Sequence, residues 1–160
     1  MAVNMFLKLD GVAGESTHKG HKDEIEVLPF SWGVAHPVPV TRGNERRRAG
    51  RAQASDITFM MAVGKASPTL MLACATGRHL KEGLFVIEKA GETPFAFYKL
   101  TVTDILVSSY QTSGASELPM DSFSLNFRTV RLRETVQDAK GAPGEFVETA
   151  FDFGRNRQIS

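Results

Sequence analysis

Side chains that could bind a metal or transfer protons are concentrated in one stretch near the start of the chain. His18, His21, Asp23 and Glu24 form a compact group of side chains that could bind a metal or exchange protons. A His-x-x-His spacing can bring two imidazoles together on a helix, but Gly20 lies between these two. Zinc would need a further ligand and ordered hydrogen-bonding partners around its histidines, and the sequence points to neither. We therefore interpret both histidines as exposed loop residues and predict no metal and no cofactor.

Other signatures of catalysis are missing from the sequence. Serines are plentiful, but none stands in a G-x-S-x-G turn. The glycines match neither a phosphate-binding loop nor a dinucleotide fingerprint. The single cysteine, Cys74, cannot form an intramolecular disulfide, and its apolar surroundings favour a small buried side chain. The sequence therefore predicts no catalytic residues, and we do not expect an enzyme.

The remaining candidate is a short basic segment, residues 41–52. It holds one glutamate and five arginines, a local net charge of +4 in a chain of net charge +1: Arg42, Arg46, Arg47, Arg48 and Arg51. Arginine makes paired hydrogen bonds to phosphate and carboxylate alike. The segment lacks the aromatic residues that usually stack on nucleic-acid bases. A contact with protein is therefore favoured, while a nucleic-acid contact and a plain solvated loop stay open.

The elements that position these residues are mostly strands. Apolar residues alternate along seven or eight segments, beginning with Met5, Leu7 and Leu9. The alternation changes phase at Leu28-Pro29, between residues 102 and 105, and near residues 128–129, which indicates bulges or edges. The pattern predicts a mainly β fold in which antiparallel sheets curl into a β-barrel.

One short helix and one long loop interrupt the strands. Ser67 is suited to the N-cap, Pro68 to the first helical turn and Gly77 to the end of the helix. Because this helix is apolar on nearly every face, we expect it to be largely covered. The loop from about residue 36 to 51 contains the basic segment, and loops of this length are usually functional or disordered.

Length and composition limit what else the chain can be. A chain of 160 residues with 42% hydrophobic residues suits one domain over residues 1–160. We find no cleaved signal peptide and no apolar stretch long enough to span a membrane. We therefore expect a protein that folds in the cytoplasm and, if exported, leaves through a dedicated machine.

Several segments resemble the haemolysin-coregulated protein (Hcp) family of type VI secretion systems. They follow the family's order over nearly the whole chain: FLKLDGVAGES at 6–16, HKGHKDEIEVLPFSWG at 18–33, ASDITFMMAVGKASPTLMLACATGRH at 54–79, LVSSYQTSG at 106–114 and SFSLNF at 122–127. A last segment, AFDFGRNR at 150–157, is similar to the family's usual ending. It departs from it at Phe151, where tryptophan is expected, and at Arg157, where lysine is common.

The resemblance implies a fold and a structural role. It implies a curled β-barrel with one flanking helix, six subunits closed into a ring, and rings stacked into a tube. It further implies that sheath, spike and baseplate proteins of the secretion system are partners. The tube would assemble in the bacterial cytoplasm, carry effectors in its lumen and be secreted without a signal peptide. A version carrying a fused toxin is not expected, because the tube domain accounts for the whole length.

The resemblance also suggests roles for particular residues. In the family, a long extension between early strands reaches the neighbouring ring, and residues 38–51 match it by position. We expect Arg42, Arg46, Arg47, Arg48 and Arg51 to make this ring–ring contact. If Phe30 and Trp32 point into the core, Ser31 faces the other way, where it could line the lumen and contact cargo. The alternative function is a small nucleic-acid-binding barrel that uses residues 41–52.

Overall fold

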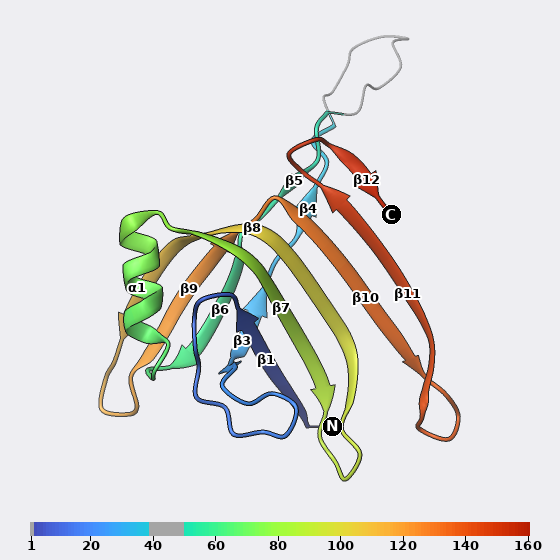
Figure 1. The fold of residues 1–160 in the computed structure, drawn as a ribbon, viewed down its shortest axis with the longest axis horizontal. Coiled ribbons are helices and arrows are strands. Elements are labelled where there is room, and N and C mark those ends of the chain that lie inside the picture. The colour runs from blue at the N-terminus through green and yellow to red at the C-terminus, as the bar shows by residue number, and fades with distance from the viewer. Residues whose placement is uncertain (1, 39–49) are drawn as a thin grey trace.

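Alternating apolar residues form antiparallel strands over most of the chain, and a single short helix interrupts them (Figure 1). The structure is a computed structural model that describes residues 2–38 and 50–160. The elements are β1 (Val3–Leu9), β2 (Ile25–Glu26), β3 (Leu28–Ser31), β4 (Val34–Ala35), β5 (Gln53–Ala54), β6 (Ile57–Ala62), α1 (Ser67–Thr76), β7 (His79–Lys89), β8 (Phe95–Ser113), β9 (Met120–Asn126), β10 (Thr129–Gln137), β11 (Pro143–Asp152) and β12 (Arg157–Ile159). The predicted mainly β fold class is confirmed.

The strands form two layers that share β8. The long layer runs in the order β12-β11-β10-β8-β7-β1-β2, and the short layer consists of β3, β6, β9 and the second half of β8. The first half of β8 pairs with β7 and β10, whereas its residues 106–113 pair with β9. Strands of the two layers cross each other in direction (Figure 1). We call β10, β11 and β12 the wing, because they extend the long layer beyond β8.

β8 changes layer at Asp104. This residue has a left-handed backbone, with φ of 53°, in the middle of a 19-residue strand. Leu100 and Val102 are buried before it and Ile105 and Val107 after it, so the inward face shifts by one residue at this point. The phase change predicted between residues 102 and 105 is therefore a bend.

The other two phase changes have different causes. The pairing of β3 with β6 shifts between Leu28 and Phe30, as the proline predicts. Near residue 128, however, the sequence pattern does not mark a bulge in one strand. The chain instead turns a corner between β9 and β10, which pair with different halves of β8. β9 buries its odd-numbered residues Phe123 and Leu125, whereas β10 buries Val130, so two separate strands produce the same change of phase that a bulge would.

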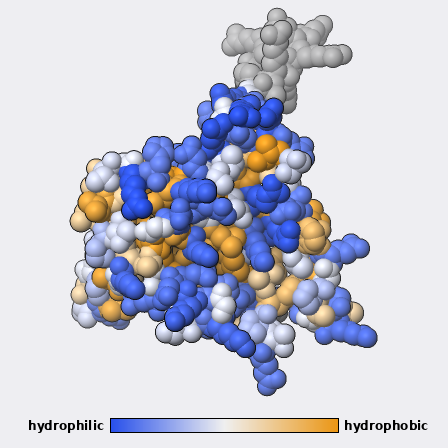
Figure 2. Space-filling model, viewed as in Figure 1, coloured by the Kyte–Doolittle hydropathy of each residue, from blue (hydrophilic) through white to orange (hydrophobic). Residues whose placement is uncertain are grey.

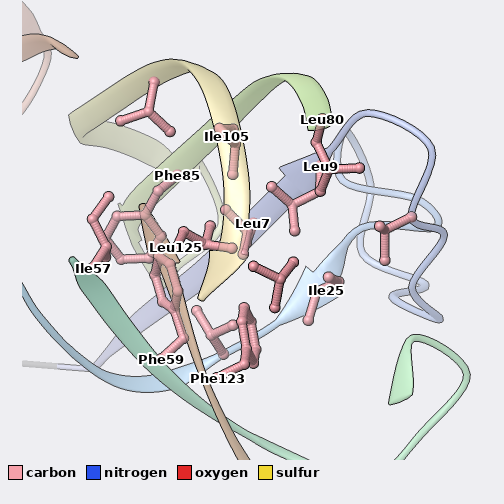
Figure 3. Packing of buried hydrophobic residues seen from close by; sticks show 14 of the residues in the cluster. Leu7, Leu9, Ile25, Ile57, Phe59, Leu80, Phe85, Ile105, Phe123 and Leu125 are labelled. Atoms are coloured by element: carbon pink, nitrogen blue, oxygen red, sulfur yellow. The ribbon is translucent and has the colours of Figure 1, made fainter. Parts of the chain in front are cut away.

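The curled sheets do not close into a barrel through backbone hydrogen bonds. β2 pairs with β1 at Phe6 and Leu7 only, and β3 pairs with β6. In the described part of the chain, no ladder joins β1 to β3. Side chains close the interior instead, with Phe59, Phe85 and Phe123 at its centre (Figure 3). The Phe59 ring centroid lies 5.2 Å from that of Phe85 and 5.5 Å from that of Phe123.

The helix differs from its prediction in two respects. Gly77 ends it with φ of 65°, as expected. The N-cap, however, is Ala66, which makes no side-chain capping bond, while Ser67 is already helical. The expectation that the helix is largely covered is wrong. Leu70 and Ala73 are buried, but Met71 is 49% and Leu72 is 59% exposed, because α1 lies at one side of the two layers (Figure 1).

Candidate functional site

The N-terminal histidines have different environments. His18 is exposed, as predicted. The same expectation for His21 is wrong, because its ring stacks on Phe6 with centroids 4.1 Å apart and planes 6° apart. Its Nδ1 lies 3.1 Å from a Glu24 carboxylate oxygen, and its Nε2 lies 2.9 Å from Oε2 of buried Glu88. An imidazole donates through both nitrogens only when it is protonated.

This histidine cluster fastens a loop to the sheet. His21 and Glu24 belong to the loop between β1 and β2, whereas Glu88 lies in β7. Among the described residues, no group of three or more His, Cys, Asp or Glu side chains is arranged to hold a metal ion. No nucleophile takes part in the cluster's hydrogen bonds. The sequence could not reveal Glu88, because it lies 67 residues away from His21 and nothing local marks it.

A second buried carboxylate fastens α1. Asp121 of β9 is fully buried and accepts hydrogen bonds from Ser67 Oγ at 2.5 Å, Thr112 Oγ1 at 2.7 Å and Tyr110 Oη at 2.9 Å. Ser67 Oγ also accepts a hydrogen bond from the Gly64 amide. Ser67, Tyr110 and Thr112 come from the KASP and YQTSG segments. Those two segments therefore have a structural role: they place α1 beside residues 110–112 of β8.

Ser31 lies where alternation predicts. Phe30 packs towards the interior, 4.7 Å from the Phe85 ring, while Ser31 is exposed on the opposite face. The register aligns it with hydroxyl side chains on every strand of the short layer. Ser31 pairs with Thr58, Thr58 with Ser124, and Ser124 with Ser109. We call these four residues the hydroxyl row.

Within its strands, the face that carries the hydroxyl row has no charged side chain, and Asp56 borders it at one end. The next row along the same face consists of Leu28, Met60, Ser122 and Gln111. In the four strand segments of the short layer, residues 28–31, 57–62, 106–113 and 120–126, Asp121 is the one charged residue, and it points inward. Asp56 lies just outside the strands, where it accepts a hydrogen bond from Ser108 Oγ at 2.6 Å.

This composition is unusual for a sheet face in contact with water. The exposed face of β1 and β7 in the long layer shows the ordinary pattern, with Lys8, Lys81 and Glu82 around a shallow hollow. In a sheet with one face in water, each strand normally alternates hydrophobic residues on the inner face with polar or charged residues on the outer face. The sequence contained the signal that would have revealed this face: four separate strand segments place no charged residue on their outward side. Only the register shows that they form one surface.

The basic segment lies almost wholly outside the described residues. Arg42, Arg46, Arg47 and Arg48 fall within residues 39–49, so their predicted contact stays a prediction. Arg51 is described, and its Nη2 donates to the carbonyl oxygens of Phe153 and Gly154 at 2.7 and 2.6 Å. These bonds tie the chain leaving the segment to the turn between β11 and β12.

The two flanks of the segment form a narrow stem. β4 and β5 pair through Val34–Ala54 and Ala35–Gln53. The Gly50 amide donates to the Pro37 carbonyl at 3.3 Å, and the Ser55 amide donates to the Gly33 carbonyl at 2.8 Å. The stem therefore holds the two described flanks of the segment side by side.

The turn between β11 and β12, to which Arg51 binds, is stabilised by charged and hydrogen-bonding groups around Asp152. Burial raises the pKa of Asp152, but the amides of Arg155 and Gly154 and the guanidinium of Arg128 outweigh burial and hold that pKa below its usual range. Near the stem, burial raises the pKa of Tyr98, Glu134 raises it further, and the hydrogen bond donated by Trp32 Nε1 at 3.0 Å opposes the rise. Asp152 holds the backbone of the turn between β11 and β12, and Tyr98 holds the Trp32 ring next to the stem.

Nothing in the described ranges forms a helix long and apolar enough to cross a membrane. The hollows among those ranges are open to solvent. One of them is lined by Ser16 beside Glu15 and Glu26, but Ser16 is buried and its Oγ accepts a hydrogen bond from the His18 amide at 3.2 Å. The notable surfaces are the uncharged face and the stem.

Known proteins resemble this chain over most of its length. The family model described as "Type VI secretion system effector, Hcp" matches residues 6–133. Protein hcp1 of Pseudomonas aeruginosa is 37% identical over 145 residues, which are 89% of this chain and 89% of that protein. A crystal structure of Hcp1 from Salmonella typhimurium superposes with a TM-score of 0.85 and 31% identity, covering 99% of this chain and 100% of the other.

A solved structure titled "Structure of a type six secretion system protein" has a TM-score of 0.91 and 28% identity, again covering 99% of this chain and 100% of the other. These matches reach both layers, α1 and the wing. The sequence similarity and the shared fold agree with the resemblance of the motif segments. The chain belongs to the Hcp family of type VI secretion proteins.

Proposed function

We propose that this chain is a structural subunit of a type VI secretion tube, with one Hcp-like domain over residues 1–160 and no catalytic role. Six copies would close into a ring, and the uncharged face of the short layer would line its lumen. That face is the observation that carries the proposal. A wall of hydroxyl, amide and apolar side chains contacts many different proteins without attracting or repelling them by charge.

The two edges of the short layer support ring closure. Among the described residues, β3 pairs with β6 on one side only, and residues 109–113 of β8 pair only with β9. Unpaired edges are surfaces onto which a strand of another chain can be added. A ring that places β3 of one copy beside β8 of the next would join the short layers into one continuous wall. Such a contact is head-to-tail, which is the kind that generates rings.

The basic segment would act between rings. We propose that Arg42, Arg46, Arg47 and Arg48 contact carboxylates or carbonyls of the adjoining ring. Arg51 has another role, because its bonds to Phe153 and Gly154 support the stem that directs the segment. Single exposed ion pairs contribute only about 0–1 kcal/mol, but the same contact repeated around a ring acts multivalently.

Export and cargo follow from the same role. The rings would assemble in the bacterial cytoplasm and leave through the secretion machine, without a signal peptide. Effectors would be carried in the lumen against the hydroxyl row, and sheath, spike and baseplate proteins would be partners. The nucleic-acid-binding alternative is not favoured, because the family match accounts for the same segment and no aromatic residue lies within it.

Solution mass and imaging test the proposal. We expect light scattering to give six times the chain mass of 17.5 kDa, and negative-stain images to show rings. A monomer at micromolar concentration would overturn the tube assignment. A gel shift with DNA and RNA at two salt concentrations tests the alternative, which requires binding that weakens steeply as salt rises.

A further inference from the structure

An apolar groove lies beneath the wing. It has a volume of about 260 Å³ and is open to solvent on one side. Its lining contains no charged residue and comes from the stem region and from the wing: Trp32, Val34, Ala52, Val130, Leu132, Thr149, Ala150, Phe151 and Phe153. The aromatic floor is firm, since the Phe151 and Phe153 rings lie 4.9 Å apart and Trp32 is held by Tyr98.

The groove is incompletely filled by the subunit itself. Val34 at its rim is 54% exposed. Val147, which precedes the groove residues on β11, is 70% exposed. Exposed apolar surface of this kind, gathered in one place, usually marks a contact with another molecule.

A second apolar surface lies on α1. The helix has no charged residue along Ser67–Thr76, and its outer side presents Met71 and Leu72 to solvent. Leucine and methionine side chains of a helix suit an apolar groove with aromatic walls. Figure 2 shows hydrophobic surface at the margin where α1 lies and again beside β4 and the upper part of β11. The two surfaces are at opposite sides of the subunit (Figure 1).

The topology places these surfaces at the two ends of the short layer. α1 begins at Asp121, next to Tyr110 and Thr112, and ends beside Leu106, which pairs with His79. The helix therefore runs along residues 106–112 of β8, on the interior side of this edge strand, where Leu70 and Ala73 join the core. The groove lies at the opposite edge, because Trp32 and Val34 continue the chain directly from β3.

We propose that α1 of one copy sits in the groove beneath the wing of the next copy, with Met71 and Leu72 inserted between the wing and the stem. This inference rests on the proposed ring. If β3 of one copy lies beside β8 of its neighbour, the neighbour's helix comes to the same side as the groove. A second copy fits better than another partner, because both surfaces are uncharged, each is unfilled, and a head-to-tail ring needs two different surfaces at opposite sides of each subunit.

Two single substitutions and their mixture test the pairing. Leu72→Glu spoils the helix surface, and Val34→Glu spoils the groove; both positions are more than half exposed, so folding should persist. Each variant alone should lose the ring and behave as a monomer in light scattering, because every contact would bury a carboxylate. An equimolar mixture should form a dimer of twice the chain mass, since one intact helix and one intact groove remain between the two variants.

Val136→Glu is the matched control, because Val136 is 55% exposed, as Val34 is 54%, but lies near the tip of the β10–β11 hairpin away from both surfaces. This variant should keep the mass of the wild type. Rings that persist in Leu72→Glu or Val34→Glu, or a mixture that stays monomeric, would overturn the pairing. A monomeric wild type would instead refute the ring on which the inference rests, so the two failures are distinguishable. Circular dichroism of each variant confirms that loss of mass is not loss of fold.

Discussion

At the scale of single residues, the titratable side chains that could have been catalytic instead hold loops and a helix in place, whereas uncharged side chains make up the exposed face of the short layer. His21 and Asp121 are both enclosed by hydrogen-bond partners, and they hold a loop and a helix in place. Asp152 orders the turn that receives Arg51. Ser31, by contrast, has no distinguishing local chemistry. Its significance comes from the neighbours that the register gives it.

The lowered pKa of Asp152 predicts a pH-dependent contribution to stability. A carboxylate whose pKa is lower in the folded than in the unfolded chain stabilises the fold above the unfolded pKa, and the contribution is lost as the pH falls through the folded pKa. We expect Asp152→Asn to lower the melting temperature at pH 7 and to lower it less at about pH 3. Thermal unfolding at both pH values measures this, with the exposed Glu117→Gln as control. An equal difference between variant and wild type at both pH values contradicts the prediction.

If the hydroxyl row lines the lumen, enlarging its side chains should release cargo while the ring stays intact. Inserting a larger side chain into a packed contact costs about 1–3 kcal/mol, so Ser31→Gln should weaken retention of lumen cargo by about tenfold. Ser109→Gln, at the other end of the row, should act in the same way. The measurement is quantification of the proteins that co-purify with wild-type and variant rings. Ser116→Gln, in the turn between β8 and β9, should retain them; normal retention by Ser31→Gln would count against a lumen-facing row.

At the scale of elements, two devices decide how strands and helix are joined. Asp104 bends β8 so that one strand serves both layers. Asp121 draws the start of α1 onto β8 and β9 through three hydroxyl donors. The helix needs this anchor, because its N-cap residue, Ala66, offers no capping side chain. Its other attachment is the inner side, where Leu70 and Ala73 are buried in the core.

The anchor predicts coupling between α1 and β9. Asp121→Asn replaces an acceptor oxygen with a donor that faces hydroxyl groups, and an unsatisfied buried group costs about 1–3 kcal/mol. Ser67→Ala removes one of the donors. In a double-mutant cycle measured by chemical denaturation, the two losses in unfolding free energy should not add, because both remove the same hydrogen bond. Additive losses would show that Ser67 and Asp121 stabilise the fold independently.

At the scale of the whole molecule, surfaces of different character lie on different sides. The uncharged face of the short layer, the exposed side of α1 and the groove beneath the wing carry no net charge, whereas the face of β1 and β7 carries lysines and acids. The basic segment leaves the body through the stem. This division fits a subunit that meets cargo on one face, like copies at its sides and an adjoining ring at the segment.

The basic segment predicts salt-sensitive stacking of rings. Replacing Arg46, Arg47 and Arg48 by glutamine should shorten or abolish tubes while single rings persist, because only the contact between rings loses charge. The effect should be greatest at low salt, where ionic contacts are least screened. Electron microscopy at low and moderate salt measures tube length. Replacing Lys8 and Lys81 on the face of β1 and β7 should leave tubes unchanged, and unaltered tubes in the arginine variant would refute the role of the segment.

Features that depend on neighbours along the chain could be predicted from the amino-acid sequence. Alternation of apolar residues predicted the strands, Pro29 predicted the shift in β3, and Gly77 predicted the end of α1, because backbone geometry acts over a few residues. The motif segments indicated the family. Sequence also placed Ser31 opposite Phe30, since side chains alternate along any strand.

The contacts between distant segments could be seen only in the folded chain. Folding brought Glu88 to His21 and Ser67 to Asp121, and it aligned Ser31 with Ser109 across two intervening strands. It also left one side of an apolar helix exposed, against the sequence-based expectation. The physical reason is that periodicity fixes which side of a strand or helix is apolar, whereas pairing order and register fix what that side faces. Burial is therefore a property of the assembled layers, and of the partners that cover them.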